Sequence, residues 1–230
     1  MTETLTNEQL ALNNLSEDIA EMMHIVLSQL TKAQEALRTC DVDLAQEIIT
    51  MEKKINSLDL RLDKSCESIL ALYSPLAANL RFTLAVMSIS AQLERIGDHA
   101  VGIAEYIDEG IINEPLDDEI LEKVKFNTMF ETAISMIDDA IYSFLKEDTN
   151  IVKWVFGKDK TINKINKETS DVVAAIGKKN PKKIKQLLYL FSIMKKLERV
   201  GDLAKNIAEE TVFYVDAKII KHKKKKKYLL

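Results

Sequence analysis

Residues that interrupt helices are scarce in this chain. Its 230 residues include only six glycines and three prolines, while 47% are hydrophobic and 30% are charged. This composition is typical of long helices joined by short connections. Apolar residues recur at spacings of three and four, and no alternating strand pattern lasts. The sequence therefore predicts an all-α protein.

Cysteines and long apolar runs are also few. The two cysteines, Cys40 and Cys66, form no CxxC pair and have no metal-ligand spacing, so we expect reduced thiols in a cytosolic protein. No apolar run approaches the ~20 residues that cross a bilayer. The first 25 residues carry no basic stretch followed by an apolar run, so no signal peptide is visible. We expect a soluble, cytoplasmic protein.

A general basic surface is missing as well. The formal net charge is −4, and six lysines lie within residues 221–230, so the rest of the chain stands at −10. An acidic body argues against nucleic acid as a partner. It would also repel a free anion such as phosphate unless a cation stood between them. The Lys-rich tail is interpreted as a solvated end, and peripheral contact with anionic lipid is the alternative.

The helical pattern is interrupted at five places. These lie near residues 39–42, 74–75, 113–118, 147–150 and 177–181. They leave six segments of roughly 28 to 35 residues, each about 40–50 Å long as a helix. Because short connections force neighbouring helices to run antiparallel, the segments should form up-down-up bundles.

One eight-residue phrase occurs twice, as LERIGDHA at 93–100 and as LERVGDLA at 197–204. Around it, residues 85–107 are identical to residues 189–211 at 11 of 23 positions, at a separation of 104 residues. Self-similarity at a fixed separation indicates two copies of one structural unit.

A second pair of segments supports this interpretation. Glu52–Asn56 matches Asp159–Asn163 at a separation of 107 residues. Each copy then holds three of the six helical segments. We predict three-helix repeats at 1–112 and 113–218 and a Lys-rich tail at 219–230.

Acidic side chains recur on matching faces of the two copies. On a helical wheel, Glu94 and Asp98 lie roughly opposite the apolar seam of their helix. Glu52 and Asn56 share a stripe on the preceding helix, so the four side chains can meet across one groove. Carboxylate and amide oxygens from two helices suit a hard cation. The predicted metal ligands are Glu52, Asn56, Glu94 and Asp98 in the first copy, and Asp159, Asn163, Glu198 and Asp202 in the second.

Each phrase also holds a glycine in mid-helix, where glycine costs ~1 kcal/mol relative to alanine. On the wheel, Gly97 and Gly201 lie between the apolar seam and the acidic stripe. Glycine at such a place lets a neighbouring backbone or a bound group come close.

Two interpretations of the acids need no metal. They can form solvated faces with ion pairs to Arg95 or Lys205, each worth only about 0.3–0.5 kcal/mol. They can also form a polar seam between helices, held by Arg95 and Arg199. His99 lies ~100° around the helix from Asp98, and we expect a surface or interhelical histidine there rather than a ligand.

Together these segments closely resemble the PhoU family, the accessory and regulatory proteins of the bacterial phosphate-specific transport system. The resemblance covers nearly the whole chain. The residues that carry it are Pro75–Arg81, Leu93–His99, Ile103–Glu105, Leu197–Asp202 and Asn206–Glu210.

The resemblance implies a cytosolic homodimer of two three-helix bundles with multinuclear metal sites on the bundle surface. It assigns those sites to the eight predicted ligands. It also implies a regulator rather than an enzyme, which restrains phosphate uptake and the phosphate-starvation response. The implied partners are the ATPase subunit of the phosphate ABC transporter and the membrane sensor histidine kinase.

The chain departs from the family pattern at Asn56, Asn163 and Asn79, where aspartate is common. Each amide brings no charge and should weaken divalent-ion binding. The oxygen-rich ligands leave iron, manganese, magnesium, calcium and zinc open. One alternative is a metal-free helical adaptor whose acidic faces dock a basic partner. Another is a metal-dependent phosphohydrolase, against which stands the lack of a second catalytic constellation.

Overall fold

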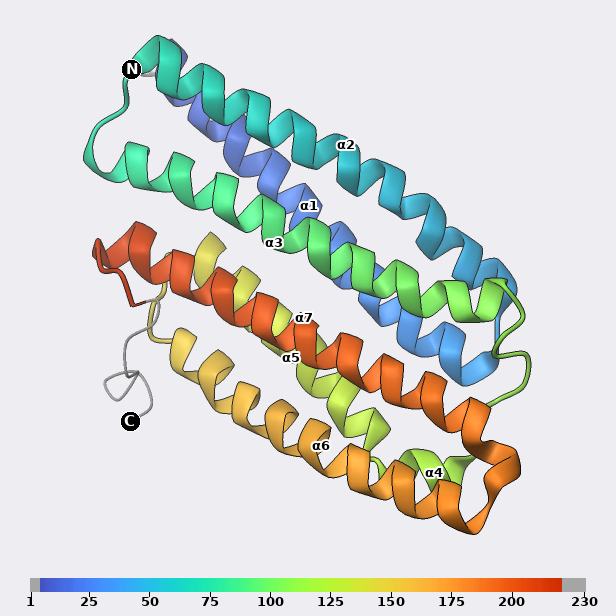
Figure 1. Cartoon of the computed structure of the whole chain (residues 1–230). Helices are drawn as coiled ribbons and strands as arrows, with labels where there is room; N and C mark the ends of the chain where they lie inside the picture. Colours follow the sequence, from blue (N-terminus) through green and yellow to red (C-terminus); the bar gives the residue numbers. More distant parts are fainter. Residues whose placement is uncertain (1–4, 221–230) are drawn as a thin grey trace.

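Every regular element of the described chain is helical, which confirms the all-α prediction (Figure 1). The computed structural model describes residues 5–220. In chain order the elements are α1 (Asn7–Thr39), α2 (Val42–Tyr73), α3 (Ala77–Asp108), α4 (Asp118–Lys123), α5 (Phe126–Leu145), α6 (Val152–Lys179), the 3₁₀-helix η1 (Pro181–Lys183) and α7 (Ile184–Asp216).

The prediction of six long helices is wrong for the fourth segment, which is divided into the short α4 and the 20-residue α5. Between them Lys125 takes a left-handed conformation, with φ of 56°. A residue in this left-handed conformation cannot continue a right-handed helix, so the helix is interrupted at Lys125. The apolar spacing runs through this point, so the sequence pattern does not reveal the break.

The other helix ends follow from local chemistry. Thr6 begins α1 through a capping box with Gln9, and Asp41 begins α2 by accepting a hydrogen bond from the Leu44 backbone amide. Ser74 ends α2 in a left-handed conformation, directly before Pro75. These ends place α1, α2 and α3 side by side, with the direction reversed at each short turn.

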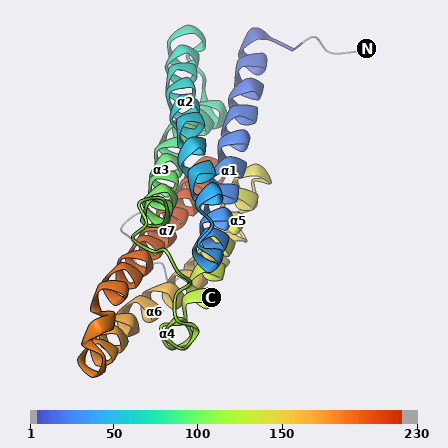
Figure 2. The same cartoon turned by 90° about the vertical axis from the view of Figure 1, so that its right-hand side faces the viewer.

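Two three-helix bundles result, one from α1–α3 and one from α5–α7, each around a core of buried aliphatic and aromatic side chains. Figures 1 and 2 show the bundles stacked, with α3 and α7 adjacent along their lengths. Gln92 accepts a hydrogen bond of 3.1 Å from Asn206, and the hydroxyls of Tyr106 and Ser192 lie 2.8 Å apart. Residue numbers therefore rise on one helix as they fall on the other, so α3 and α7 are antiparallel.

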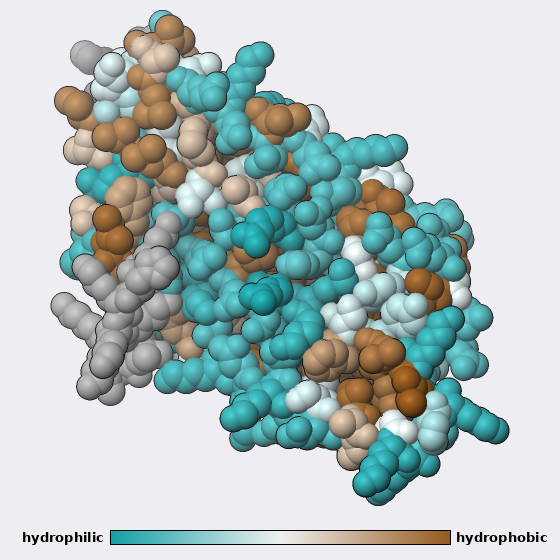
Figure 3. Space-filling model, viewed as in Figure 1, coloured by the Kyte–Doolittle hydropathy of each residue, from teal (hydrophilic) through white to brown (hydrophobic). Residues whose placement is uncertain are grey.

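The repeat boundaries at 112 and 113 stay a prediction, and most of the Lys-rich tail lies outside the described residues. The segment between Asp108 and Asp118 connects the bundles. Both Cys40 and Cys66 are free thiols, and burial raises the pKa of Cys66 to about 12. On the face seen in Figure 3, hydrophilic side chains cover the middle, where α3 and α7 lie side by side.

Candidate functional site: two acidic clusters

The first acidic cluster consists of Glu52 and Asn56 on α2 and Glu94 and Asp98 on α3. Glu52 is only partly exposed, and its Oε1 is buried without a hydrogen-bond partner in the described structure. Burial raises the pKa of Glu52, and the charges of Asp98 and Glu94 raise it further. The hydrogen bond from Gln29 to Glu52 Oε2 acts in the opposite direction, as does the nearby Asn56 amide more weakly. The fold therefore brings all four predicted residues of the first repeat into electrostatic contact.

Glu94 is held in a similar environment. Burial raises its pKa first, followed by the charges of Asp98 and of Asp59 on α2, with a weaker opposing effect of Arg95. In residues 5–220, no lysine or arginine forms an ion pair with Glu52, Glu94 or Asp98. The alternative in which these acids form ion pairs with Arg95 is therefore not realised there, although the charge of Arg95 still acts weakly on Glu94.

Gln29 of α1 also lies at this cluster, and sequence reasoning missed it. The side chain is fully buried, and its Nε2 donates to the Ile48 carbonyl at 3.0 Å and to Glu52 Oε2 at 3.4 Å. Its Oε1 has no donor in the described structure. The feature of the sequence that could have indicated Gln29 is a single amide within the apolar stripe of α1. Two buried oxygens, on Gln29 and Glu52, thus lack a donor at the same place.

Gly97 makes this arrangement possible. A Cβ at this position would lie 3.1 Å from Glu52 Oε2, 3.1 Å from Ile55 Cδ1 and 3.2 Å from Gln29 Oε1. The glycine thus admits three side chains from α1 and α2, rather than a neighbouring backbone.

The second acidic cluster, Asp159 and Asn163 on α6 with Glu198 and Asp202 on α7, is built differently. The Lys205 ammonium donates to Asp202 at 2.6 Å and to Asp159 at 3.1 Å. Its side chain is 20% exposed. Burial alone would lower the pKa of Lys205, but the hydrogen bond and charge of Asp202 and the charge of Asp159 outweigh it and raise the pKa.

Arg199 adds positive charge to the second cluster. Its guanidinium lies 3.7 Å from Glu198 and 3.8 Å from Asp202. Asn163 is exposed on α6, one turn beyond Asp159. The sequence-based alternative of acids paired with Lys205 and Arg199 is therefore realised in the second repeat and absent from the first.

Gly201 faces the counterparts of the residues at Gly97. A Cβ there would lie 2.9 Å from Ile162 Cδ1 and 3.7 Å from Met136 Cε. At the 107-residue separation Met136 matches Gln29, so an apolar thioether stands where the first repeat has an amide whose oxygen lacks a donor.

A cation fits the two clusters unequally. Within residues 5–220, no three Asp, Glu, His or Cys side chains are arranged as a group that could hold a metal ion. The first cluster nevertheless has buried oxygens without donors on Gln29 and Glu52 and no ion pair to a lysine or arginine, which suits a cation. Glu198 Oε2 of the second cluster is also buried without a hydrogen-bond partner, but it lies 3.7 Å from the Arg199 guanidinium. The second cluster already contains an ammonium group between its two aspartates.

His99 lies near the first cluster, between α3 and α7. Burial lowers its pKa first, and Lys196, Arg95 and Arg199 lower it further against the opposing charge of Asp98. Lys196 and Arg199 belong to α7, so the imidazole lies within electrostatic reach of both α3 and α7, as expected for an interhelical side chain.

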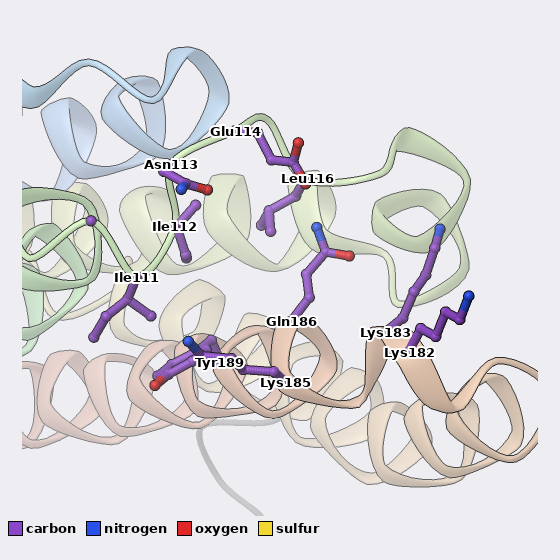
Figure 4. Close-up of a pocket in the computed structure, with 11 residues that line it drawn as sticks. Ile111, Ile112, Asn113, Glu114, Leu116, Lys182, Lys183, Lys185, Gln186 and Tyr189 are labelled. Carbon is purple, nitrogen blue, oxygen red and sulfur yellow. The ribbon is translucent and has the colours of Figure 1, made fainter.

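A separate pocket of about 380 Å³ lies where the segment after α3 meets the start of α7 (Figure 4). Figure 4 shows Gln186 pointing from α7 toward Leu116. Lys183, another lining residue, is paired with Asp117, the N-cap residue directly before α4. None of the eight predicted ligands lines this pocket.

Comparison with known proteins identifies the fold and the repeat. A family model for the PhoU domain matches the chain twice, over residues 19–107 and 126–211. The chain belongs to the PhoU family. The two matches cover α1–α3 and α5–α7, so each bundle of this PhoU-family protein is one PhoU domain.

Relatives of similar length support the assignment. The phosphate-specific transport system accessory protein PhoU homolog of Aquifex aeolicus is 31% identical over 92% of this chain and 94% of its own length. Homolog 1 of Thermotoga maritima is 28% identical over 90% of this chain and 88% of its own. The chain is therefore a member of a family of regulatory accessory proteins.

Solved PhoU structures have the same fold. PhoU from Pseudomonas aeruginosa has a TM-score of 0.84 at 26% identity, covering 91% of this chain and 99% of that one. The phosphate transport system regulatory protein PhoU from Streptococcus pneumoniae has a TM-score of 0.81 at 26% identity, covering 93% and 99%. In the described part of this chain, no helix is long and apolar enough to span a bilayer.

Proposed function

We propose that this PhoU-family protein is a cytoplasmic, metal-binding regulator without enzymatic activity. It restrains phosphate uptake and the phosphate-starvation response, as a homodimer that contacts the transporter ATPase subunit, the sensor histidine kinase or both. Family membership supports the regulatory role. The observation that carries the metal is the unpartnered, buried Oε1 of Glu52 beside two further carboxylates.

In the first cluster, Glu52, Glu94 and Asp98 would supply carboxylate oxygens and Asn56 an amide oxygen. Iron, manganese, magnesium and zinc all accept such ligands. A bound cation neutralises the mutual repulsion of the acids and orders the outer face of α2 and α3 for a partner. Asn56 and Asp98 are exposed, so that face is open to another protein.

Elemental mass spectrometry of the purified protein, before and after chelation, tests the metal. We expect wild type to hold metal that chelation removes and that Asp98→Ala lacks. Binding to the purified ATPase subunit, measured with and without chelator, tests the regulatory contact. We expect chelation and Asp98→Ala to weaken it to the same extent.

Two outcomes would overturn the proposal in different ways. Chelator-insensitive binding of the ATPase subunit by a metal-free wild type would favour the adaptor, in which exposed acids such as Asp98 meet basic partner residues directly. Turnover of a generic phosphate ester, abolished by Asp98→Ala, would favour a phosphohydrolase.

A further inference from the structure

We propose that Lys205 takes the place of a metal ion in the second acidic cluster, so that cation binding is confined to the first repeat. This inference rests on the proposed function, and it departs from the sequence-based expectation of one metal site in each repeat. Lys205 bridges Asp159 on α6 and Asp202 on α7, at 3.1 and 2.6 Å. One ammonium group thereby joins the two helices that a shared cation would join.

The matching position in the first repeat cannot do this. Lys205 corresponds to Val101 at the 104-residue separation. Val101 is partly buried and packs against the core. The acids beside it therefore have no internal cation, and Glu52 keeps a buried oxygen without a donor.

Other differences between the two copies also make the second copy less suited to a cation. Asp59 and Asp63 of α2 are matched by the uncharged Asn166 and Ser170 of α6. Gln29, fully buried with an unpartnered Oε1, is matched by Met136. Glu198 Oε2 and Asn166 Oδ1 of the second repeat are also buried without a hydrogen-bond partner, so the difference between the copies lies in charge. The second repeat has fewer acids at these positions and one added ammonium.

Electrostatics then opposes a second metal ion. A divalent cation that enters between Asp159 and Asp202 has to displace a charged group already hydrogen-bonded to both. It would also stand close to the Arg199 guanidinium, which lies 3.8 Å from Asp202. Because Asp159 and Asp202 are both already hydrogen-bonded to Lys205, a weakly bound ion cannot replace the lysine.

A reciprocal exchange tests the proposal with Mn²⁺ as the probe, measured by equilibrium dialysis of the full chain. Lys205→Val places the first-repeat residue in the second repeat, and Val101→Lys does the reverse. We expect Lys205→Val to gain Mn²⁺ sites that Asp202→Asn removes. We expect Val101→Lys to lose at least tenfold in Mn²⁺ affinity. Lys205→Met, which keeps the aliphatic stem, serves if Lys205→Val does not fold.

In wild type, Asp98→Asn should abolish Mn²⁺ binding and Asp202→Asn should leave it unchanged. Loss of wild-type Mn²⁺ through Asp202→Asn, or an unchanged number of sites in both Lys205→Val and Lys205→Met, would overturn the role of Lys205. The proposed function fails differently, because wild type and Asp98→Asn would then bind equally little metal. In that case the gain of sites by either Lys205 variant still decides whether Lys205 excludes a cation.

Discussion

Ser88 of α3 donates a hydrogen bond of 2.5 Å to Glu210 of α7, across the contact between the two bundles. At the 104-residue separation, Ser88 matches Ser192 and Glu210 matches Tyr106, the pair 2.8 Å apart elsewhere in the same contact. The two copies thus face each other through equivalent positions, with a serine on each side. One pair ends on a buried carboxylate and the other on a partly buried phenol.

This difference predicts unequal costs for two equivalent substitutions. Ser88→Ala removes a donor from the buried Glu210 carboxylate, so the free energy of unfolding should fall by about 1–2 kcal/mol. Ser192→Ala, the matched control, should cost less than about 1 kcal/mol because Tyr106 is partly exposed and can turn to water. Urea unfolding of both variants measures the costs. Equal losses in the free energy of unfolding would show that the hydrogen bond to Glu210 stabilises the fold no more than the contact between Ser192 and Tyr106.

The two acidic clusters predict stability changes of opposite sign. In chelator at neutral pH, Glu52→Gln should raise the free energy of unfolding by up to ~1 kcal/mol, because a half-buried, unpaired charge is removed. Asp159→Asn should lower it by about 1–2 kcal/mol, because Lys205 loses one of its two carboxylates. Thermal or urea unfolding of the pair checks the signs. A loss of stability in both variants would mean that Glu52 has a partner in solution.

The acids and the glycines of both clusters could be predicted from the sequence, because the repeat marks the same positions twice. The pairing of Lys205 with Asp159 could not. The two residues are 46 positions apart, and a helical wheel gives the face of a side chain but not its reach across a bundle. The sequence indicates Lys205 as one of several basic residues near the acids. Only the packing of α6 on α7 shows that Lys205 is the one that pairs with Asp159.

Gln29 and Lys125 were missed for different reasons. Gln29 lies on α1, outside the two matched segments. A single amide in an apolar stripe does not indicate which residues it contacts. Lys125 ends the regular pattern through its backbone conformation alone, while apolar spacing continues on both sides. Periodicity reports which face is buried, and it does not report a single residue with positive φ.

The raised pKa of Glu52 predicts a pH dependence of the metal-free protein. A carboxyl whose pKa is higher in the folded state destabilises that state at neutral pH, and the penalty is relieved as pH falls through the raised pKa. The stability of wild type relative to Glu52→Gln should therefore increase as pH falls from 7 through the raised pKa toward the ordinary glutamate pKa of about 4.3. Urea unfolding in chelator at several pH values measures this difference.

The comparison with Glu52→Gln is needed because His99 acts in the opposite sense. Its pKa is lowered on folding, so its contribution to stability is lost as pH falls through the ordinary histidine pKa near 6.5. The histidine is present in both proteins and cancels in the difference. A difference that stays constant from pH 7 down to the ordinary glutamate pKa of about 4.3 would contradict the electrostatic description of the first cluster.

The end of α2 predicts a stabilising substitution remote from both clusters. Ser74 is exposed and has φ of 45° and ψ of 56°, a left-handed conformation that costs an L-residue roughly 1–2 kcal/mol. Ser74→Gly should remove that strain and, after the greater entropy of glycine in the unfolded chain, raise the free energy of unfolding by about 0.5–1 kcal/mol. Urea unfolding measures the gain.

Ser68 provides the matched control on the same helix. It is exposed like Ser74 but lies within regular helix, where its hydroxyl donates to the Lys64 carbonyl at 2.8 Å. Ser68→Gly should therefore lower the free energy of unfolding by roughly 0.5–1 kcal/mol, because glycine loses more entropy in a helix interior than other residues do. The same chemical change then has opposite signs six residues apart. If both glycines destabilise, Ser74 does not hold its left-handed conformation in solution, and the turn into Pro75 is formed in another way.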